Sequence, residues 1–248
     1  MDLVIENLSK RYPNGVQALR DVTLSIGPGM FGLLGPNGAG KSTLMRTLAT
    51  LQDPDTGSVR LGDIDLLRDK PAVRKLLGYL PQEFGVYPKV RAIDLLDHLG
   101  RLKGLADRTL RKQTVDALLQ RTNLWEARNR ALGTFSGGMK QRFGIAQALI
   151  GDPRLLIVDE PTAGLDPEQR VAFRSLLRDL GQQATVIVST HLVEDVGAAC
   201  TQVGLMDKGR IVFQGTPAEL IARAEGIDAA GDAPLERGYS AVLAQARS

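Results

Sequence analysis

The segment GPNGAGKST at residues 35–43 restricts the fold more than any other part of the sequence. It fits the phosphate-loop pattern G-x-x-x-x-G-K-[ST], in which backbone N–H groups converge on phosphate oxygens at the start of a helix. Apolar residues at 30–35 predict a strand before it, and residues 41–51 predict a helix after it, as the motif requires. The motif predicts phosphate binding by Gly35, Pro36, Asn37, Gly38, Ala39, Gly40, Lys41, Ser42 and Thr43.

Two side chains of this loop carry specific expectations. Lys41 is expected to reach the β- and γ-phosphates of a nucleotide, and Ser42 is expected to coordinate Mg²⁺. The alternative is a glycine-rich turn with an ordinary surface lysine.

The segment LLIVDEP at 155–161 supplies the acidic groups that phosphate chemistry needs. Its four apolar residues predict a buried strand, which places Asp159 at the carboxyl end, where ligands of α/β sheets bind. Asp159 is predicted to hold Mg²⁺, and Glu160 to act as the general base toward an attacking water. We expect the two side chains to point in opposite directions, as neighbours on a strand do. The alternatives are a helix-capping aspartate and a solvated glutamate before a proline.

The segment TFSGGMKQRFG at 134–144 resembles half of a binding site. Ser136, Gly137 and Gly138 lead directly into a predicted helix, and the free N–H groups of a helix start attract anions. No carboxylate or histidine lies beside them in the sequence, so another part of a site must supply the chemistry.

The order of apolar segments indicates an α/β fold. Strand-like runs at 2–8, 16–26 and 30–35 precede the first helix, and strands then alternate with helices from residue 155 to 215. Short apolar runs between helices predict a parallel sheet buried on both faces. Residues 91 to about 130 carry helical periodicity instead, which predicts a separate helical subdomain. The tail from Glu225 is linker-like, with a final helix expected near 235–246.

Composition excludes several classes of protein. The formal net charge is only +3, and the densest basic stretch, 108–113, is typical of a solvated helix face, so no nucleic acid is expected as a partner. A single cysteine excludes an internal disulfide and favours a reducing compartment. Neither a secretory signal nor a run of 18 apolar residues is found, so any service to a membrane must go through a partner.

With these three motifs in this order, the sequence resembles the ATP-binding subunits of ABC transporters over about residues 2–222. The resemblance implies ATP and Mg²⁺ as ligands. It also implies an α/β fold with a P-loop NTPase core on a mostly parallel sheet, an N-terminal antiparallel β subdomain and an inserted α-helical subdomain. We expect an ATP-binding domain over 1–224, with the helical part at about 91–150, and a linker with a short helix over 225–248.

Further roles follow from the resemblance. Tyr12 matches the aromatic residue that stacks on adenine, and Gln82 matches the glutamine that touches Mg²⁺ and water and couples to the membrane subunit. His191 matches the histidine that contacts the γ-phosphate, whereas His98 is expected to be structural. The family's D-loop is matched by Gly164, Leu165 and Asp166.

The signature turn departs from the family pattern Leu-Ser-Gly-Gly-Gln. Phe135 and Met139 occupy its first and last places, while Ser136, Gly137 and Gly138 are kept. In this family the turn caps the γ-phosphate held by the phosphate loop of a second subunit, which explains the missing chemistry beside it. Phosphate binding is therefore expected to survive, whereas any contact of the usual glutamine is in question.

The expected function is an ATPase that dimerises head to tail, with a second copy or a paralogous subunit, and powers a separate permease from the cytoplasmic face of the membrane. The amino-acid sequence of residues 135–167 and 189–196 most resembles that of drug- and antibiotic-resistance export ATPases. Three apolar residues of the loop after Gln82 are expected either to dock the permease or to pack beneath the helical subdomain: Phe84, Val86 and Tyr87.

Two other functions compete with this expectation. A soluble ABC ATPase acting on DNA or ribosomes typically carries two ATPase units or a long coiled-coil insertion, and 248 residues leave room for neither. A P-loop regulator without turnover would not need the general base that Glu160 offers.

Overall fold

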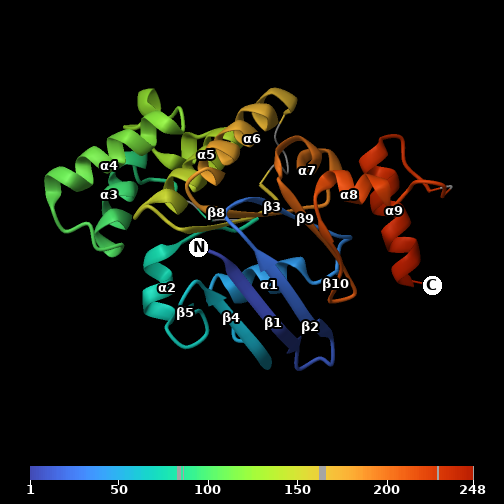
Figure 1. The fold of residues 1–248 in the computed structure, drawn as a ribbon. Coiled ribbons are helices and arrows are strands. Elements are labelled where there is room, and N and C mark those ends of the chain that lie inside the picture. The colour runs from blue at the N-terminus through green and yellow to red at the C-terminus, as the bar shows by residue number, and fades with distance from the viewer. Residues whose placement is uncertain (83–84, 86, 162–165, 228, 248) are drawn as a thin grey trace.

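Two β-sheets with a helix packed between them form the frame of the molecule (Figure 1). The computed structural model describes residues 1–82, 85, 87–161, 166–227 and 229–247. Within these residues the smaller sheet is antiparallel, in the order β2-β1-β4-β5. Its strands are β1 (Leu3–Arg11), β2 (Gln17–Ile26), β4 (Thr56–Leu61) and β5 (Ile64–Asp65).

The larger sheet has the order β10-β9-β3-β8-β7-β6 in the described residues. All its neighbouring strands run parallel except the hairpin of β9 and β10. The strands are β3 (Gly29–Leu34), β6 (Leu77–Leu80), β7 (Leu155–Asp159), β8 (Thr185–Thr190), β9 (Gln202–Asp207) and β10 (Arg210–Gly215).

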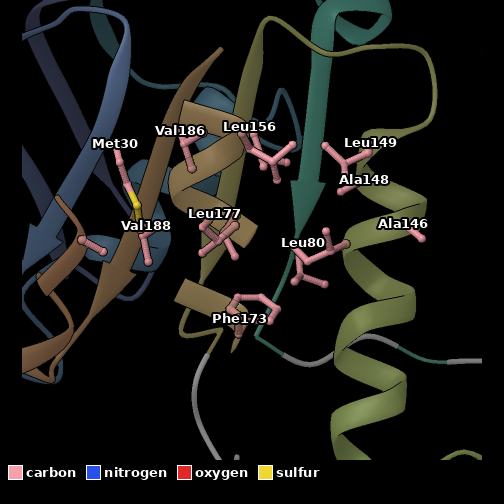
Figure 2. Packing of buried hydrophobic residues seen from close by; sticks show 14 of the residues in the cluster. Met30, Leu80, Ala146, Ala148, Leu149, Leu156, Phe173, Leu177, Val186 and Val188 are labelled. Atoms are coloured by element: carbon pink, nitrogen blue, oxygen red, sulfur yellow. The ribbon is translucent and has the colours of Figure 1, made fainter. Parts of the chain in front are cut away.

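Side chains of the larger sheet alternate between two hydrophobic cores. Leu155 and Ile157 face the core shared with the smaller sheet and α1 (Lys41–Leu48), whereas Leu156 and Val158 face the opposite core. Figure 2 shows this second core, where strand residues of β3, β6, β7 and β8 meet apolar residues of α5 (Gly137–Leu149) and α6 (Pro167–Gly181). Burial on both faces explains why these strands are continuous apolar runs.

Two groups of helices stand at opposite ends of the molecule (Figure 1). Between β6 and β7 lie α3 (Ala92–Leu102), α4 (Arg108–Arg121) and α5, with 3₁₀ turns at Trp125–Ala127 and Leu132–Thr134. This group stands at one end of the molecule, and the C-terminal helices stand at the other (Figure 1). The other helices are α2 (Lys70–Leu76), α7 (Val193–Ala199), α8 (Pro217–Ala222) and α9 (Pro234–Arg247).

The α/β class, the mostly parallel sheet and the antiparallel β-sheet formed largely by N-terminal strands are confirmed. The sequence did not predict residues 56–80, where β4, β5, α2 and β6 follow one another in short elements. Within the described residues, none of the helices combines the length and the apolar character needed to cross a bilayer.

The parallel strands place their carboxyl ends along one edge of the larger sheet. The phosphate loop follows β3, Gln82 follows β6, and Asp159 ends β7. His191 follows β8, and the turn at Lys208 follows β9. Segments far apart in the sequence are thereby gathered at one edge, where α/β folds bind their ligands.

Candidate functional site

A cleft of about 570 Å³ lies at this carboxyl edge, a size typical of small-molecule sites. It is open to solvent on one side and is bounded by the phosphate loop, the hairpin between β1 and β2, and the ends of β6, β7, β8 and β9. Among the predicted site residues the cleft is lined by Tyr12, Asn37, Gly38, Ala39, Gly40, Lys41, Ser42, Thr43, Gln82, Glu160 and His191.

The phosphate loop takes a backbone course that glycine permits. Gly38 and Gly40 have φ angles of 80° and 110°, and a Cβ atom on Gly40 would collide with the Ala18 carbonyl oxygen. Gly40 is the residue that precedes α1, so the free N–H groups of the first turn of α1 begin at the cleft. Gly35 and Pro36 belong to the loop, but they do not line the cleft in the described residues.

The Lys41 ammonium lies among carbonyl and carboxylate groups. Its side chain is buried, and Nζ donates hydrogen bonds to the carbonyl oxygens of Gly35 at 2.6 Å and Pro36 at 3.2 Å. Burial lowers the pKa of Lys41, whereas the nearby carboxylates of Glu160 and Asp159 oppose that shift. The lysine is thus a buried cation at the floor of a cleft, the environment in which a phosphate would satisfy it.

Tyr12 is tied to the start of α1 by its hydroxyl group. The hydroxyl lies 3.3 Å from Thr43 Oγ1 and donates to Gln52 Oε1 at 3.1 Å. Gln52 Nε2 in turn donates to the Thr43 carbonyl oxygen at 2.8 Å. These bonds hold the half-buried ring beside the phosphate loop with its position fixed relative to the α1 N-terminus.

The two acidic residues at the end of β7 have different environments. Asp159 is 4% exposed and accepts a hydrogen bond from Ser189 Oγ of β8. Glu160 lies beyond the strand, in the left-handed backbone region at φ 47°, so strand alternation does not set its direction. Its N–H donates to both Ser189 O and Ser189 Oγ, each at 3.1 Å.

Glu160 and His191 form a close pair in the cleft. His191 Nδ1 lies 2.8 Å from Glu160 Oε2, and Glu160 is buried while the imidazole is half exposed. Glu160 has a positive φ angle, a conformation that costs a non-glycine residue free energy. Residues with such strained backbones cluster at functional sites. The pair therefore presents a carboxylate that is held in place by both its backbone and a neighbouring ring.

The signature turn does not line the cleft of its own chain. Ser136 precedes α5 and accepts a hydrogen bond from Met139 N at 3.3 Å, so it caps the helix. Ser136 and Gly137 are exposed, whereas a Cβ on Gly138 would meet the Gln169 side chain of α6. The exposed residues at the start of α5 are not among those that line the cleft around Lys41.

The two departures in the signature are packing residues. Phe135 is buried and meets Phe143 edge to face, with ring centroids 6.3 Å apart. Met139 is half buried and packs against the same core. Both side chains therefore face inward, away from the exposed serine and glycine.

The D-loop and the segment after Gln82 are only partly described. Gly164 and Leu165 lie outside the described residues, whereas Asp166 caps α6 by accepting from Gln169 N at 2.8 Å. Phe84 and Val86 also lie outside the described residues, and Tyr87 is exposed. His98 is an exposed residue of α3.

The cleft also contains residues that sequence reasoning missed. Gln17 and Arg20 of β2 line it, and so does Lys208 in the turn between β9 and β10. Their positions depend on how distant segments pack, and no motif marks them. The basic residue followed by glycine at 208–209 was the available signal for a tight turn.

Comparisons with known proteins show the family of the chain. Residues 19–163 match the family model described as ABC transporter. The chain belongs to the ABC transporter family. It is an ATP-binding subunit of that family and an ATPase.

Two relatives illustrate the similarity. The chain is 39% identical over 219 residues to the uncharacterized ABC transporter ATP-binding protein YxlF of Bacillus subtilis, covering 88% of this chain and 72% of the relative. It is 34% identical over 226 residues to the linearmycin resistance ATP-binding protein LnrL of the same organism, covering 90% of this chain and 72% of the relative. The predicted likeness to resistance-type ATPases is thereby confirmed.

Solved structures show the same fold. An ATP-binding subunit of an ABC transporter superposes with a TM-score of 0.84 at 26% identity, covering 98% of this chain and all of that chain. The ABC cassette MJ0796, known as a dimer and in a post-hydrolysis state with ADP and Pi, superposes with a TM-score of 0.78 at 25% identity. That match covers 86% of this chain and 98% of the cassette.

The ring and the hydroxyl of Tyr12 make different contacts, so their contributions to ATP binding can be tested separately. Tyr12→Ala should weaken ATP binding by about 1–3 kcal/mol, the range for a base stacked on an aromatic ring. Tyr12→Phe keeps the ring and should lose only a small part of this binding free energy, because Gln52 still holds Thr43 in place. Titration with ATP and GTP measures both, and the two nucleotides should lose comparable affinity. An equal loss in the two variants would assign the effect to the hydroxyl instead.

Proposed function

We propose that this ATPase subunit closes head to tail with a second copy or a paralogous subunit around ATP, and drives a separate export permease at the cytoplasmic face of the membrane. The observation that carries the proposal is the division of the site. One chain brings the phosphate loop, Gln82 and the Glu160–His191 pair to a cleft, while the exposed Ser136 lies outside that cleft. A second chain must then supply a signature turn.

ATP binding in this cleft uses groups already in place. The Tyr12 ring would stack on adenine, and the N–H groups from Gly38 to Thr43 would surround the phosphates. Lys41 would exchange its two carbonyl acceptors for the β- and γ-phosphate oxygens. That exchange satisfies a buried cation with a charged partner, which makes the stronger hydrogen bond.

The residues around Lys41 fit a magnesium ion. Ser42 and Gln82 line the cleft with a hydroxyl and an amide oxygen, and Asp159 adds a buried carboxylate at the same edge. Oxygen donors of this kind, completed by phosphate and water, are those that Mg²⁺ takes. Bound there, the ion would offset the charge of the β- and γ-phosphates.

Glu160 would act as the general base. Its carboxylate can accept the proton of a water that attacks the γ-phosphorus, and His191 Nδ1 holds that carboxylate at 2.8 Å. The other ring nitrogen of His191, Nε2, is then left to contact the γ-phosphate. As an imidazolium, with an N–H on each ring nitrogen, the histidine would donate to the carboxylate through one nitrogen and to the phosphate through the other.

Glu160→Gln removes the base and keeps the shape of the side chain. Turnover should fall by about two or more orders of magnitude, as loss of a general base typically does, while ATP binding remains. Steady-state hydrolysis and nucleotide titration on the same preparation test this. Near-normal hydrolysis would mean that another group takes the proton, with His191 the next candidate.

The proposed cap on the partner's γ-phosphate depends on the Ser136 hydroxyl. A hydroxyl has one proton and two lone pairs. Because Ser136 Oγ accepts from Met139 N, its own proton stays available to a phosphate oxygen. The N–H groups at the start of α5 point the same way and add the positive end of the helix dipole.

Ser136→Ala in the slow Glu160→Gln background tests the head-to-tail arrangement. A hydrogen bond to a charged group contributes about 1.5–3 kcal/mol, and two-fold symmetry deletes it twice. ATP-dependent dimer affinity, followed by gel filtration, should fall by roughly two to four orders of magnitude while ATP affinity of the monomer is unchanged.

Because Ser136 also caps α5, a second variant separates folding from binding. Ser136→Asp keeps a capping oxygen but places a negative charge against the phosphate, so the dimer should still be lost. A joint fall of monomer and dimer affinity would place Ser136 in the site of its own chain and contradict the proposal.

A groove beside β6 supports a docking site for the permease. It holds about 630 Å³ between α2, α3 and the segment that follows α1, and Leu51 and Leu102 line it with 61% and 71% of their surfaces exposed. Lys103 forms part of its floor, since Nζ donates to the carbonyls of Arg74 and Leu77 at 2.7 and 2.8 Å. β6 runs from this groove to Gln82, which gives movement in the groove a short path to the cleft.

The single cysteine of the chain, Cys200, is buried, so an introduced thiol can map this contact. Leu102→Cys, labelled with a thiol-reactive photocrosslinker and added to membranes of the source cells, should crosslink on illumination to an integral membrane protein, because the groove would face the permease. Leu110→Cys is the matched control, an exposed leucine on α4 outside the groove. Mass spectrometry identifies the adduct, and equal crosslinking from both positions would remove the groove as the docking site.

A further inference from the structure

The turn between β9 and β10 forms a wall of the phosphate loop. Gly209 N donates to the Ala39 carbonyl oxygen at 2.8 Å. A Cβ atom on Gly35 would collide with the Met206 carbonyl oxygen, and one on Gly40 would lie 2.8 Å from Met206 Cε. The loop therefore rests directly on residues 206–209, and any shift of that turn must shift the loop.

The same turn also borders the cleft. Gly209 O accepts from Arg20 N of β2 at 2.8 Å, and both Arg20 and Lys208 line the cleft. Lys208 has a φ of 46°, an unfavourable conformation for a lysine that must be held by its surroundings. The turn thus fixes one side of the nucleotide site through its backbone and presents a cation there.

Asp207, the residue between these contacts, is anchored by the C-terminal helix. Its carboxylate is 4% exposed and makes a two-pronged ion pair with Arg247 of α9, Nε to Oδ2 at 3.0 Å and Nη2 to Oδ1 at 2.8 Å. The Arg247 hydrogen bonds hold the pKa of Asp207 below its usual range. Paired geometry of this kind restricts both position and orientation.

Helix α9, which carries Arg247, packs closely against its neighbours. Its Leu235 packs so closely on α7 that a Cβ on Gly197 would lie 2.8 Å from Leu235 Cδ2. On the α8 side, a Cβ on Gly238 would collide with the Leu220 carbonyl oxygen. Val242 and Leu243 are buried in the core that α9 shares with the larger sheet.

We propose that Arg247 is a positioning residue for nucleotide binding, which holds Asp207 and thereby keeps the β9–β10 turn against the phosphate loop. The helix α9 then sets the affinity of the cleft for ATP without touching the nucleotide. The proposal rests on the ATP-binding function and adds a residue far from its motifs.

Arg247→Gln tests the proposal, with Arg237→Gln as the matched control. Arg237 also lies on α9, but its Nε donates to the Gly231 carbonyl oxygen at 3.0 Å. Arg247→Gln should raise the Kd and the KM for ATP by about three- to tenfold, the size by which residues outside a site usually modulate it, while kcat changes less than about twofold. Amide hydrogen exchange in residues 35–40 and 207–209 should quicken. Arg247→Lys, which keeps the charge without the fork, should fall between wild type and Arg247→Gln.

The split between KM and kcat separates positioning from simple loss of structure. A helix that only stabilises the fold would lower the active fraction, and so kcat, with the KM of the remaining enzyme unchanged. That result, or an equal rise of KM in Arg237→Gln, would overturn the proposal. Wild-type protein titrated in parallel must bind ATP. If it binds and the Arg247 variants match it, this inference fails alone, whereas a wild type without ATP affinity would overturn the ATP-binding function itself.

Discussion

Burial of the parallel sheet on both faces is the constraint on which the rest of the structure depends. Because both faces of the sheet are covered, only the ends of the strands are accessible to a ligand. Parallel strands bring all their carboxyl ends to the same edge. The phosphate loop, the acidic pair after β7 and the histidine after β8 are gathered in that way. The residues of the site are thus collected at one edge of the sheet, and packing in the two hydrophobic cores fixes the strands that carry them.

The charged groups at that edge lie near groups of opposite charge or hydrogen-bond partners. Lys41 is buried near two carboxylates, Glu160 and Asp159, so the cation is not isolated in a poorly solvated place. Asp159 is in turn bonded to Ser189, and Glu160 to His191. Each charged group has a partner that fixes its direction, which is the preorganisation that electrostatic catalysis needs.

The sequence was informative where local patterns and the tertiary structure agree. Apolar runs such as 155–159 predicted buried strands, and the phosphate loop carries its structure in its own glycines. The short elements at 56–80 gave weak patterns, because β5 has only two residues and β4 is half exposed. Lys208 and Arg20 could not be predicted as cleft residues, since the hydrogen bond between Gly209 and Ala39 that places them joins segments 170 residues apart in the chain.

The side-chain hydrogen bond from Gln141 Nε2 to the Pro161 carbonyl oxygen, 2.6 Å long, links α5 to the residue that follows Glu160. This hydrogen bond connects α5, which begins with the signature turn, to the segment that carries Glu160 in the same chain. In a head-to-tail pair the first serves the neighbour's nucleotide and the second serves the chain's own. Through such a linkage one occupancy can act on the other, and thermodynamic reciprocity requires any effect of the first nucleotide on the second to be matched by an equal factor in the reverse direction.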